Sequence, residues 1–104
     1  MVEQRMGYFV VINEQGPQWD KQHPMREQKG WNEHAAFMDA LEAEHVVVLG
    51  GPLRNYSKHR AMLIINAPDE QALRKRLAED PWMRDGILRP DQFYPWEILL
   101  GKLP

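Results

Sequence analysis

The stretch WNEHAAFMDALEAEHVVVLGGPL, residues 31–53, decides how the rest of the chain is interpreted. Its apolar residues recur at helical spacing, which predicts an amphipathic helix over 31–45. The apolar run over 46–49 then predicts a short buried strand, and Gly50-Gly51-Pro52 predicts a tight turn at its end. His34 lies one turn into the helix beside its apolar stripe, so it is the first candidate for chemistry.

The flanking segments supply the remaining elements. Residues 6–12 and 60–66 are rich in aromatic and β-branched types, which predicts strands. An early proline followed by acidic residues predicts a second helix over 67–79. Residues 87–100 form a last extended stretch, and its interior prolines favour the edge of a sheet. The polar segment 13–30 has no clear period and is expected to be an irregular loop, with Trp19 packed against the domain.

The order strand, helix, strand, strand, helix, strand predicts an α+β, ferredoxin-like βαββαβ fold in one domain over 1–104. Two helices would then cover one face of a four-stranded antiparallel sheet. Three of the four strands are apolar on both faces, so the second face would expose more apolar surface than a soluble monomer usually does. We therefore expect a homodimer that pairs the two sheets face to face.

Composition excludes several classes of protein. The chain has 104 residues, 43% of them apolar, and a net charge of −2, which is ordinary for a globular domain and argues against a general nucleic-acid binder. No apolar run approaches the roughly 20 residues that span a membrane. The absence of cysteine excludes disulfides, thiolate metal sites and a cysteine nucleophile, and fits a reducing compartment. We expect a cytoplasmic protein.

The candidate functional residues each have an ordinary interpretation as well. The four histidines lack metal-ligand spacing, and nucleotide-binding glycine motifs are missing, so neither a metal nor a cofactor is expected. His34 is either a half-buried histidine bonded to a backbone carbonyl or an acid–base group. Asp80 precedes a proline and could simply cap the turn that follows, or it could also meet His34. Gly50-Gly51-Pro52 is either a plain turn or a place where a ligand approaches the backbone.

Four motifs together resemble those of the YciI-like (YCII-related) family. They are W-x-x-H-x-x-F-M-x-x-L at 31–41, V-V-V-L-G-G-P-L at 46–53, A-P-D-E at 67–70 and D-P-W at 80–82, and the similarity spans roughly residues 6–99. The resemblance implies a ferredoxin-like fold that pairs into a dimeric α/β barrel. It also implies an active site with His34 on the first helix, Asp80 near the D-P motif, and Gly51-Pro52 after the second strand.

One member of that family is a dehydrochlorinase acting on a chlorinated hydroxyhydroquinone, and muconolactone isomerases share the barrel type. The resemblance therefore implies a small cofactor-independent lyase or isomerase that moves a proton on a small aromatic or lactone-like substrate. His34 would be the general base or acid, and Asp80 would orient it. The substrate would lie against Trp31, Trp82 or Phe37, near Gly51 and Pro52. Arg54 would hold a carboxylate or phenolate, unless it is an ordinary solvated arginine.

Two other hypotheses remain open from the sequence. The first is a non-catalytic dimer of the same fold that binds a small ligand, in which the pocket persists without a contact between His34 and Asp80. The second is a haem-using or oxygen-using relative of the same barrel type, in which His34, His45 or His59 is an axial ligand.

Overall fold

The computed structural model describes residues 7–54 and 57–103. The elements in chain order are β1 (Gly7–Gln15), the 3-10 turn η1 (Met25–Glu27), α1 (Trp31–Ala43), β2 (Val47–Pro52), β3 (Arg60–Ala67), α2 (Glu70–Leu77), α3 (Pro81–Arg84) and β4 (Leu88–Trp96). The βαββαβ order is confirmed, with α3 as a short addition before the last strand. Position 6 of the predicted first strand, and positions 55 and 56 between β2 and β3, lie outside the described residues.

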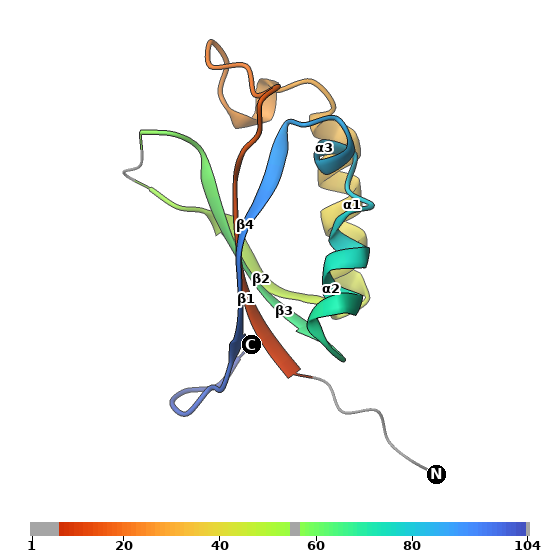
Figure 1. Ribbon diagram of the computed structural model, residues 1–104, viewed down its shortest axis with the longest axis vertical. Helices are drawn as coiled ribbons and strands as arrows, with labels where there is room; N and C mark the ends of the chain where they lie inside the picture. The colour runs from red at the N-terminus through yellow and green to blue at the C-terminus, as the bar shows by residue number, and fades with distance from the viewer. Residues whose placement is uncertain (1–6, 55–56, 104) are drawn as a thin grey trace.

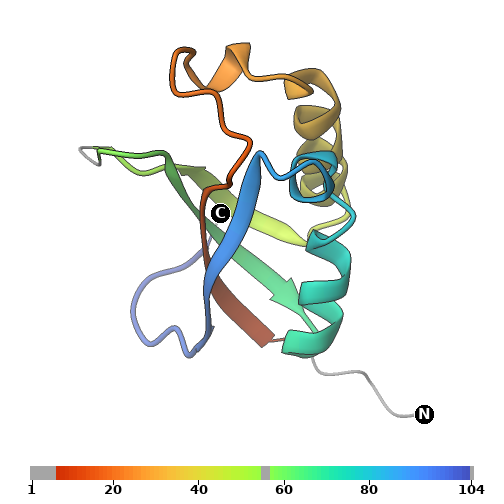
Figure 2. The same cartoon turned by 45° about the horizontal axis from the view of Figure 1, so that its top comes forward.

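The four strands form one antiparallel sheet in the order β2-β3-β1-β4. The helices α1, α2 and α3 lie on one side of this sheet, as both views show (Figures 1 and 2). The α+β, ferredoxin-like class predicted from the sequence is therefore confirmed. The strand β4 lies at an edge, as expected from Pro90 and Pro95, because a proline cannot donate a hydrogen bond to a neighbouring strand.

The main core lies between the sheet and the two longer helices. Alternate residues of β1 and β3 point inward, and they pack against leucines of α1 and α2. The buried members are Phe9, Val11, Leu41, Val47, Leu63, Ile65, Ala67, Leu73 and Leu77. Burying one leucine or phenylalanine stabilises a fold by about 1.5–3 kcal/mol, so this cluster holds the helices on the sheet. The other residues of β1 point to the face without helices, which we call the open face.

A second apolar cluster lies at the end of the sheet where β4 begins. Trp82, Ile87 and Leu88 are buried there, and four partly buried side chains pack against them: Trp19, Met25, Trp31 and Met83. Two of these four come from segment 16–30, which both views place at the end of the sheet beside the start of α1 (Figures 1 and 2). The expected packing of Trp19 is confirmed, and the segment is anchored through it.

Backbone contacts fix the start of the same segment. The Gly16 N–H donates to Ile87 O over 2.8 Å, and the Gln18 N–H donates to Gly86 O over 2.9 Å. A Cβ atom on Gly16 would lie 2.3 Å from the carbonyl oxygen of Gly86. Such a distance is too short for any side chain, so this close approach of two backbones requires glycine.

Several boundaries predicted from the sequence were wrong. Gly50-Gly51-Pro52 is not a turn but the second half of β2, paired with Leu63, Met62 and Ala61. The loop begins at Gly16 instead of position 13, because β1 continues to Gln15 with partners on both sides. The last strand ends at Trp96 and does not reach position 100.

The predicted start of α1 at Trp31 is confirmed. Gly30 is the residue that precedes the helix, in a left-handed conformation with φ 78°, and it offers no side-chain cap. The positive φ favours glycine at this position.

Candidate functional site

His34 and Asp80 are in direct contact, although 46 positions separate them in sequence. The Nδ1 atom of His34 lies 2.8 Å from Oδ2 and 3.0 Å from Oδ1 of Asp80. The Asp80 side chain is 3% exposed and the His34 side chain 13% exposed. A carboxylate in this position accepts a hydrogen bond from Nδ1–H and fixes the ring tautomer, which leaves Nε2 as the nitrogen able to accept a proton.

Asp80 is held in place by the start of α3. Its Oδ1 also accepts a hydrogen bond from the Trp82 N–H over 2.9 Å, and Pro81 occupies the first helical position. This is the capping arrangement expected from the D-P-W sequence. The carboxylate therefore caps the helix and contacts His34 at the same time, so the two interpretations of Asp80 coexist.

Aromatic rings fix the orientation of the His34 imidazole. It stacks on the Trp82 ring with a centroid distance of 4.0 Å and an interplanar angle of 5°. The Trp82 indole is itself fixed, since its Nε1–H donates to Lys29 O over 2.9 Å. Trp31 lies beside both rings, 5.6 Å from Trp82 and 5.8 Å from His34 between ring centroids. The imidazole is thus oriented by its carboxylate and by two indoles.

His34 lines a cavity of about 530 Å³ between α1 and the sheet. This is within the range of small-molecule sites. Short side chains explain the space. Ala61 of β3 lies between Pro52 of β2 and Asn13 of β1, which are its partners in the two strand pairings. Two residues along β2, Gly50 lies opposite Leu63, and a Cβ atom there would be 2.5 Å from the Leu63 side chain.

Most of the site residues predicted from the sequence meet at this cavity. Trp31, His34, Gly51, Pro52 and Trp82 line it, and the buried Asp80 contacts His34. Gly51 lines the cavity with its backbone. It has no side chain, and its position in β2, opposite Met62, faces the open face. Arg54 is exposed and is not among the lining residues. The arginine at the cavity is Arg26, whose guanidinium carbon lies 5.8 Å from the Trp31 ring centroid.

His59 also lines the cavity, and the sequence analysis considered it only as an axial ligand in the haem hypothesis. Its ring stacks on Trp19 with a centroid distance of 4.4 Å and an interplanar angle of 9°. Burial lowers the pKa of His59 below its ordinary value of 6.5, and the positive charge of a protonated His34 lowers it further. His59 therefore favours its neutral form. The position of the His59 ring depends on its contact with Trp19, and spacing in the sequence alone does not predict this contact.

Asn13 is the second lining residue that the sequence analysis did not select. It is 4% exposed, and its Oδ1 is buried without a hydrogen-bond partner in residues 7–54 and 57–103. A signal for it exists in the sequence. Phe9 and Val11 point inward, so the alternation of a strand continues to Asn13 and places a polar side chain on the core face.

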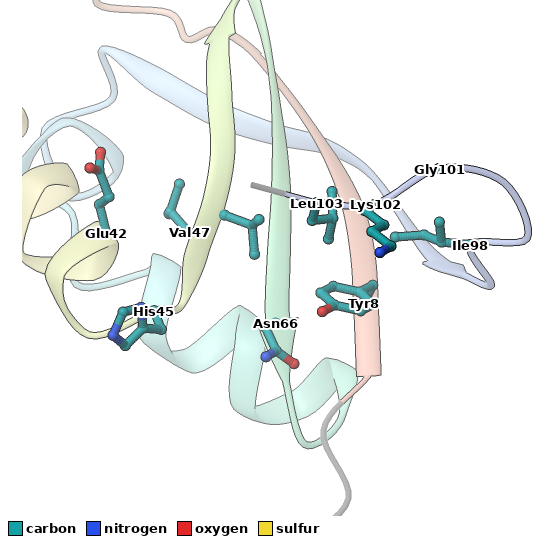
Figure 3. Close-up of a pocket in the computed structure, with 10 residues that line it drawn as sticks. Tyr8, Glu42, His45, Val47, Asn66, Ile98, Gly101, Lys102 and Leu103 are labelled. Carbon is teal, nitrogen blue, oxygen red and sulfur yellow. The ribbon is translucent and has the colours of Figure 1, made fainter.

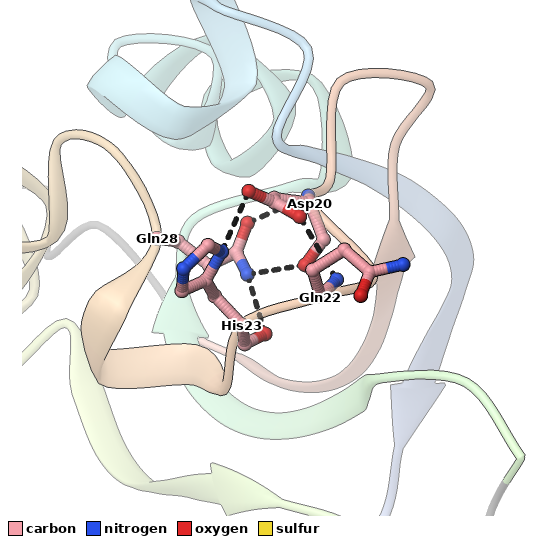
Figure 4. Close-up of polar contacts among 4 residues, drawn as sticks. All are labelled: Asp20, Gln22, His23 and Gln28. Carbon is pink, nitrogen blue, oxygen red and sulfur yellow. Dashed lines mark hydrogen bonds and ion pairs between the residues drawn. The ribbon is translucent and has the colours of Figure 1, made fainter.

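The segment 16–30 forms one wall of the site and is held by Gln28. The Gln28 side chain is 4% exposed, accepts from the Asp20 N–H, and donates to the carbonyl oxygens of Asp20 and His23, each over 2.8 Å (Figure 4). The His23 ring in turn lies 2.7 Å from the Asp20 carboxylate. These bonds close a compact loop next to Met25 and Arg26, which line the cavity.

A larger cavity of about 690 Å³ lies elsewhere, at the β2 edge and the open face. Glu42 and His45 lie on one side of β2, and Tyr8, Lys102 and Leu103 lie on the other (Figure 3). Within the described residues it contains no hydrogen-bonded acid–base pair like that of His34 and Asp80. We therefore place the candidate active site in the smaller cavity, on chemistry and not on volume.

Two further searches give limits on the described part of the chain. Among residues 7–54 and 57–103, no three histidine, aspartate or glutamate side chains gather closely enough to hold a metal ion. No helix among them is long and apolar enough to cross a membrane.

Comparison with known proteins identifies one family. The sequence matches the YCII-related domain over residues 6–97, which is most of the chain. No curated protein matches it.

Proposed function

Because the chain belongs to the YCII-related domain family, we propose that it is a small cofactor-independent enzyme of the lyase or isomerase type. In this proposal His34 transfers a proton on a small aromatic or lactone-like substrate. The observation that supports it most directly is the 2.8 Å contact from His34 Nδ1 to the buried Asp80, at the wall of a cavity of small-molecule size.

The chemistry follows from the hydrogen bonds. With its Nδ1–H donating a hydrogen bond to Asp80, the neutral His34 ring accepts a substrate proton at Nε2. The carboxylate then stabilises the resulting imidazolium, and the same nitrogen returns the proton to the leaving group or to another carbon. Positioned acid–base catalysis of this kind contributes about 10²–10⁴-fold to a rate. Asp80 is a positioning residue in this scheme, since it contacts His34 and not the substrate.

The substrate would bind between aromatic and cationic groups. Trp31 and Trp82 offer ring faces beside His34. Arg26 lines the cavity and Arg54 does not, so we propose for Arg26 the anion-binding role that the sequence suggested for Arg54. A guanidinium there would pair with a carboxylate or phenolate oxygen of the substrate.

The assembly and the location are also part of the proposal. The open face carries exposed aromatic and aliphatic side chains, which supports a homodimer formed through the sheets. A chain without cysteine has no need of an oxidising compartment, which supports a cytoplasmic location.

The test is a screen for proton transfer in D₂O. Small lactones and hydroxylated or chlorinated aromatics are incubated with the wild type, and NMR follows deuterium incorporation, isomerisation or halide release. We expect turnover that falls by about 10²–10⁴-fold in His34→Gln. His45→Asn is the matched control, because this histidine does not line the candidate site. Equal turnover in wild type and His34→Gln would refute the proposed role of His34.

A second candidate function is a non-catalytic dimer that binds a small ligand. The observation that favours it is the cavity itself, because a cavity of this size can bind a small ligand without catalysing a reaction. Ligand binding without turnover, and with equal affinity in wild type and His34→Gln, would select this alternative.

A further inference from the structure

We infer that His59 and Asn13 form a second polar subsite in the candidate cavity, which binds an uncharged hydroxyl or carbonyl oxygen of the substrate. The inference rests on the proposed function, because it adds a substrate-contacting subsite to the same cavity. It assigns to the substrate a second polar group in addition to the one that exchanges a proton with His34.

The strand pairing brings the two residues together. Asn13 lies opposite Ala61 in the pairing of β1 with β3. Two positions along, the Gln15 N–H donates to His59 O over 3.0 Å, and the His59 N–H donates to Gln15 Oε1 over 3.0 Å. Side chains two positions apart on a strand share a face, so Asn13 and His59 are diagonal neighbours on the face toward the helices.

His59 is held in position but retains its hydrogen-bonding capacity. Trp19 stacks on its ring and the backbone bonds to Gln15 fix its main chain. Within residues 7–54 and 57–103, neither ring nitrogen of His59 has a hydrogen-bond partner. A neutral imidazole has one donor and one acceptor nitrogen, so it can bind a hydroxyl group in either direction or donate to a carbonyl.

Asn13 supplies an independent observation. Its carboxamide is buried, and its Oδ1 has no partner among the described residues. An unsatisfied buried polar group is costly to a fold, so its presence beside a cavity indicates a binding role. A carboxamide both donates and accepts, which matches a hydroxyl or carbonyl group.

The chemistry of the subsite restricts the ligand class. Neither side chain carries a fixed charge, so the subsite would favour an uncharged oxygen over a phosphate or an ammonium group. Arg26 and His34 lie elsewhere on the cavity wall and contribute the charged and titrating groups. A small planar molecule with two oxygen substituents satisfies both regions, because one oxygen reaches His34 while the second binds His59 and Asn13.

The first measurement is histidine-selective NMR on the wild type with catechol as the probe and toluene as the apolar comparison. We expect catechol to shift the ring signals of both His34 and His59, and toluene to leave the His59 nitrogen signals unchanged. A shift of His34 alone would overturn the subsite while leaving the proposed function intact. Shifts of neither histidine would overturn the subsite, and the turnover screen with His34→Gln would then decide the proposed function.

The second measurement compares affinities in His59→Phe, because phenylalanine keeps a ring to stack on Trp19 and removes both nitrogens. We expect catechol to bind about tenfold more weakly, as for the loss of one or two hydrogen bonds, while toluene affinity is unchanged. His45→Asn is the control. Unchanged catechol affinity in His59→Phe would show that the ring serves packing only and would overturn the inference. The wild-type NMR shifts decide the matter if the variant does not fold.

Discussion

Asp80 has two structural tasks, and substitutions can separate them. Its carboxylate accepts from the Trp82 N–H and from the His34 ring. Asparagine retains an oxygen for the cap but loses the negative charge, whereas alanine loses both. We expect Asp80→Ala to lower the free energy of unfolding by about 1–2 kcal/mol more than Asp80→Asn, from loss of the cap. Urea unfolding measures this difference.

Asp80→Ala also tests the contact between Asp80 and His34. Nitrogen NMR of the ring should report the tautomer with a proton on Nδ1 in the wild type, and a mixture of tautomers in Asp80→Ala. The control is Asp69→Ala, which removes the cap of α2 and leaves Asp80 untouched. Identical ring spectra in the wild type and Asp80→Ala would contradict the proposed orienting role.

His59 makes stability depend on pH in a defined direction. Burial, and then the charge of His34, lowers the pKa of His59 from 6.5. The unfolded chain therefore takes up this proton at a higher pH than the folded chain. The stability that depends on a neutral His59 is complete above about pH 6.5, and it is lost as pH falls through the pKa of His59 in the folded protein. Between about pH 7 and pH 5, the wild type should lose more unfolding free energy than His59→Phe. Parallel curves would exclude the effect.

Residue-level prediction from the sequence succeeded where local chemistry decides the outcome. The cap at Asp80 and the apolar-side position of His34 follow from spacing of a few residues. The contributions of His59 and Arg26 depend on where segment 16–30 packs, which is a property of the tertiary structure. Arg54 was selected for its nearness in sequence to Gly51-Pro52, but it is exposed outside the cavity lining.

At the level of elements, the close approach of segment 16–30 to the α3–β4 connection is sensitive to one methyl group. In Gly16→Ala the new Cβ would lie 2.3 Å from Gly86 O, and backbone atoms must move to relieve this clash. We expect a loss of about 1–3 kcal/mol in unfolding free energy. Gly51→Ala is the control, because its Cβ would meet no atom within 4 Å. Thermal unfolding of both proteins gives the comparison, and equal stabilities would disprove the constraint.

The mistake over Gly50-Gly51-Pro52 has a physical explanation. Glycine and proline usually interrupt strands, so their cluster predicted a turn. β2 is an edge strand, where a proline can be tolerated because the missing N–H need not face a partner. Gly50 fits against the Leu63 side chain, a tertiary contact that a single sequence does not display.

For the whole molecule, the fold was predictable because strand and helix periods alternate clearly along the chain. The pattern also indicated a sheet apolar on both faces, and the structure contains such a sheet. Large side chains remain exposed on the open face: Tyr8 at 36%, Leu49 at 44%, Met62 at 37%, Tyr94 at 49% and Trp96 at 40%. They come from all four strands, and strand pairing places Tyr8 directly beside Trp96.

We propose that a second copy of the chain covers this face, and the assembly can be tested by placing charge within it. Met62 and Tyr94 lie on the neighbouring strands to either side of β1, so Met62→Glu with Tyr94→Glu would bury two carboxylates at a sheet-to-sheet contact. Burying unpaired charge is unfavourable. Sedimentation equilibrium should therefore show a dimer for the wild type and a monomer for the double variant.

Gln71→Glu provides the matched control, because this exposed residue belongs to α2, on the helical side of the sheet. It adds a carboxylate without touching the open face and should remain dimeric. Far-ultraviolet circular dichroism must show that the double variant is folded. A wild-type monomer, or a double variant that still dimerises, would contradict assembly through this face. Because the candidate cavity lies on the helical side of each sheet, a folded monomeric variant should keep its contact between His34 and Asp80.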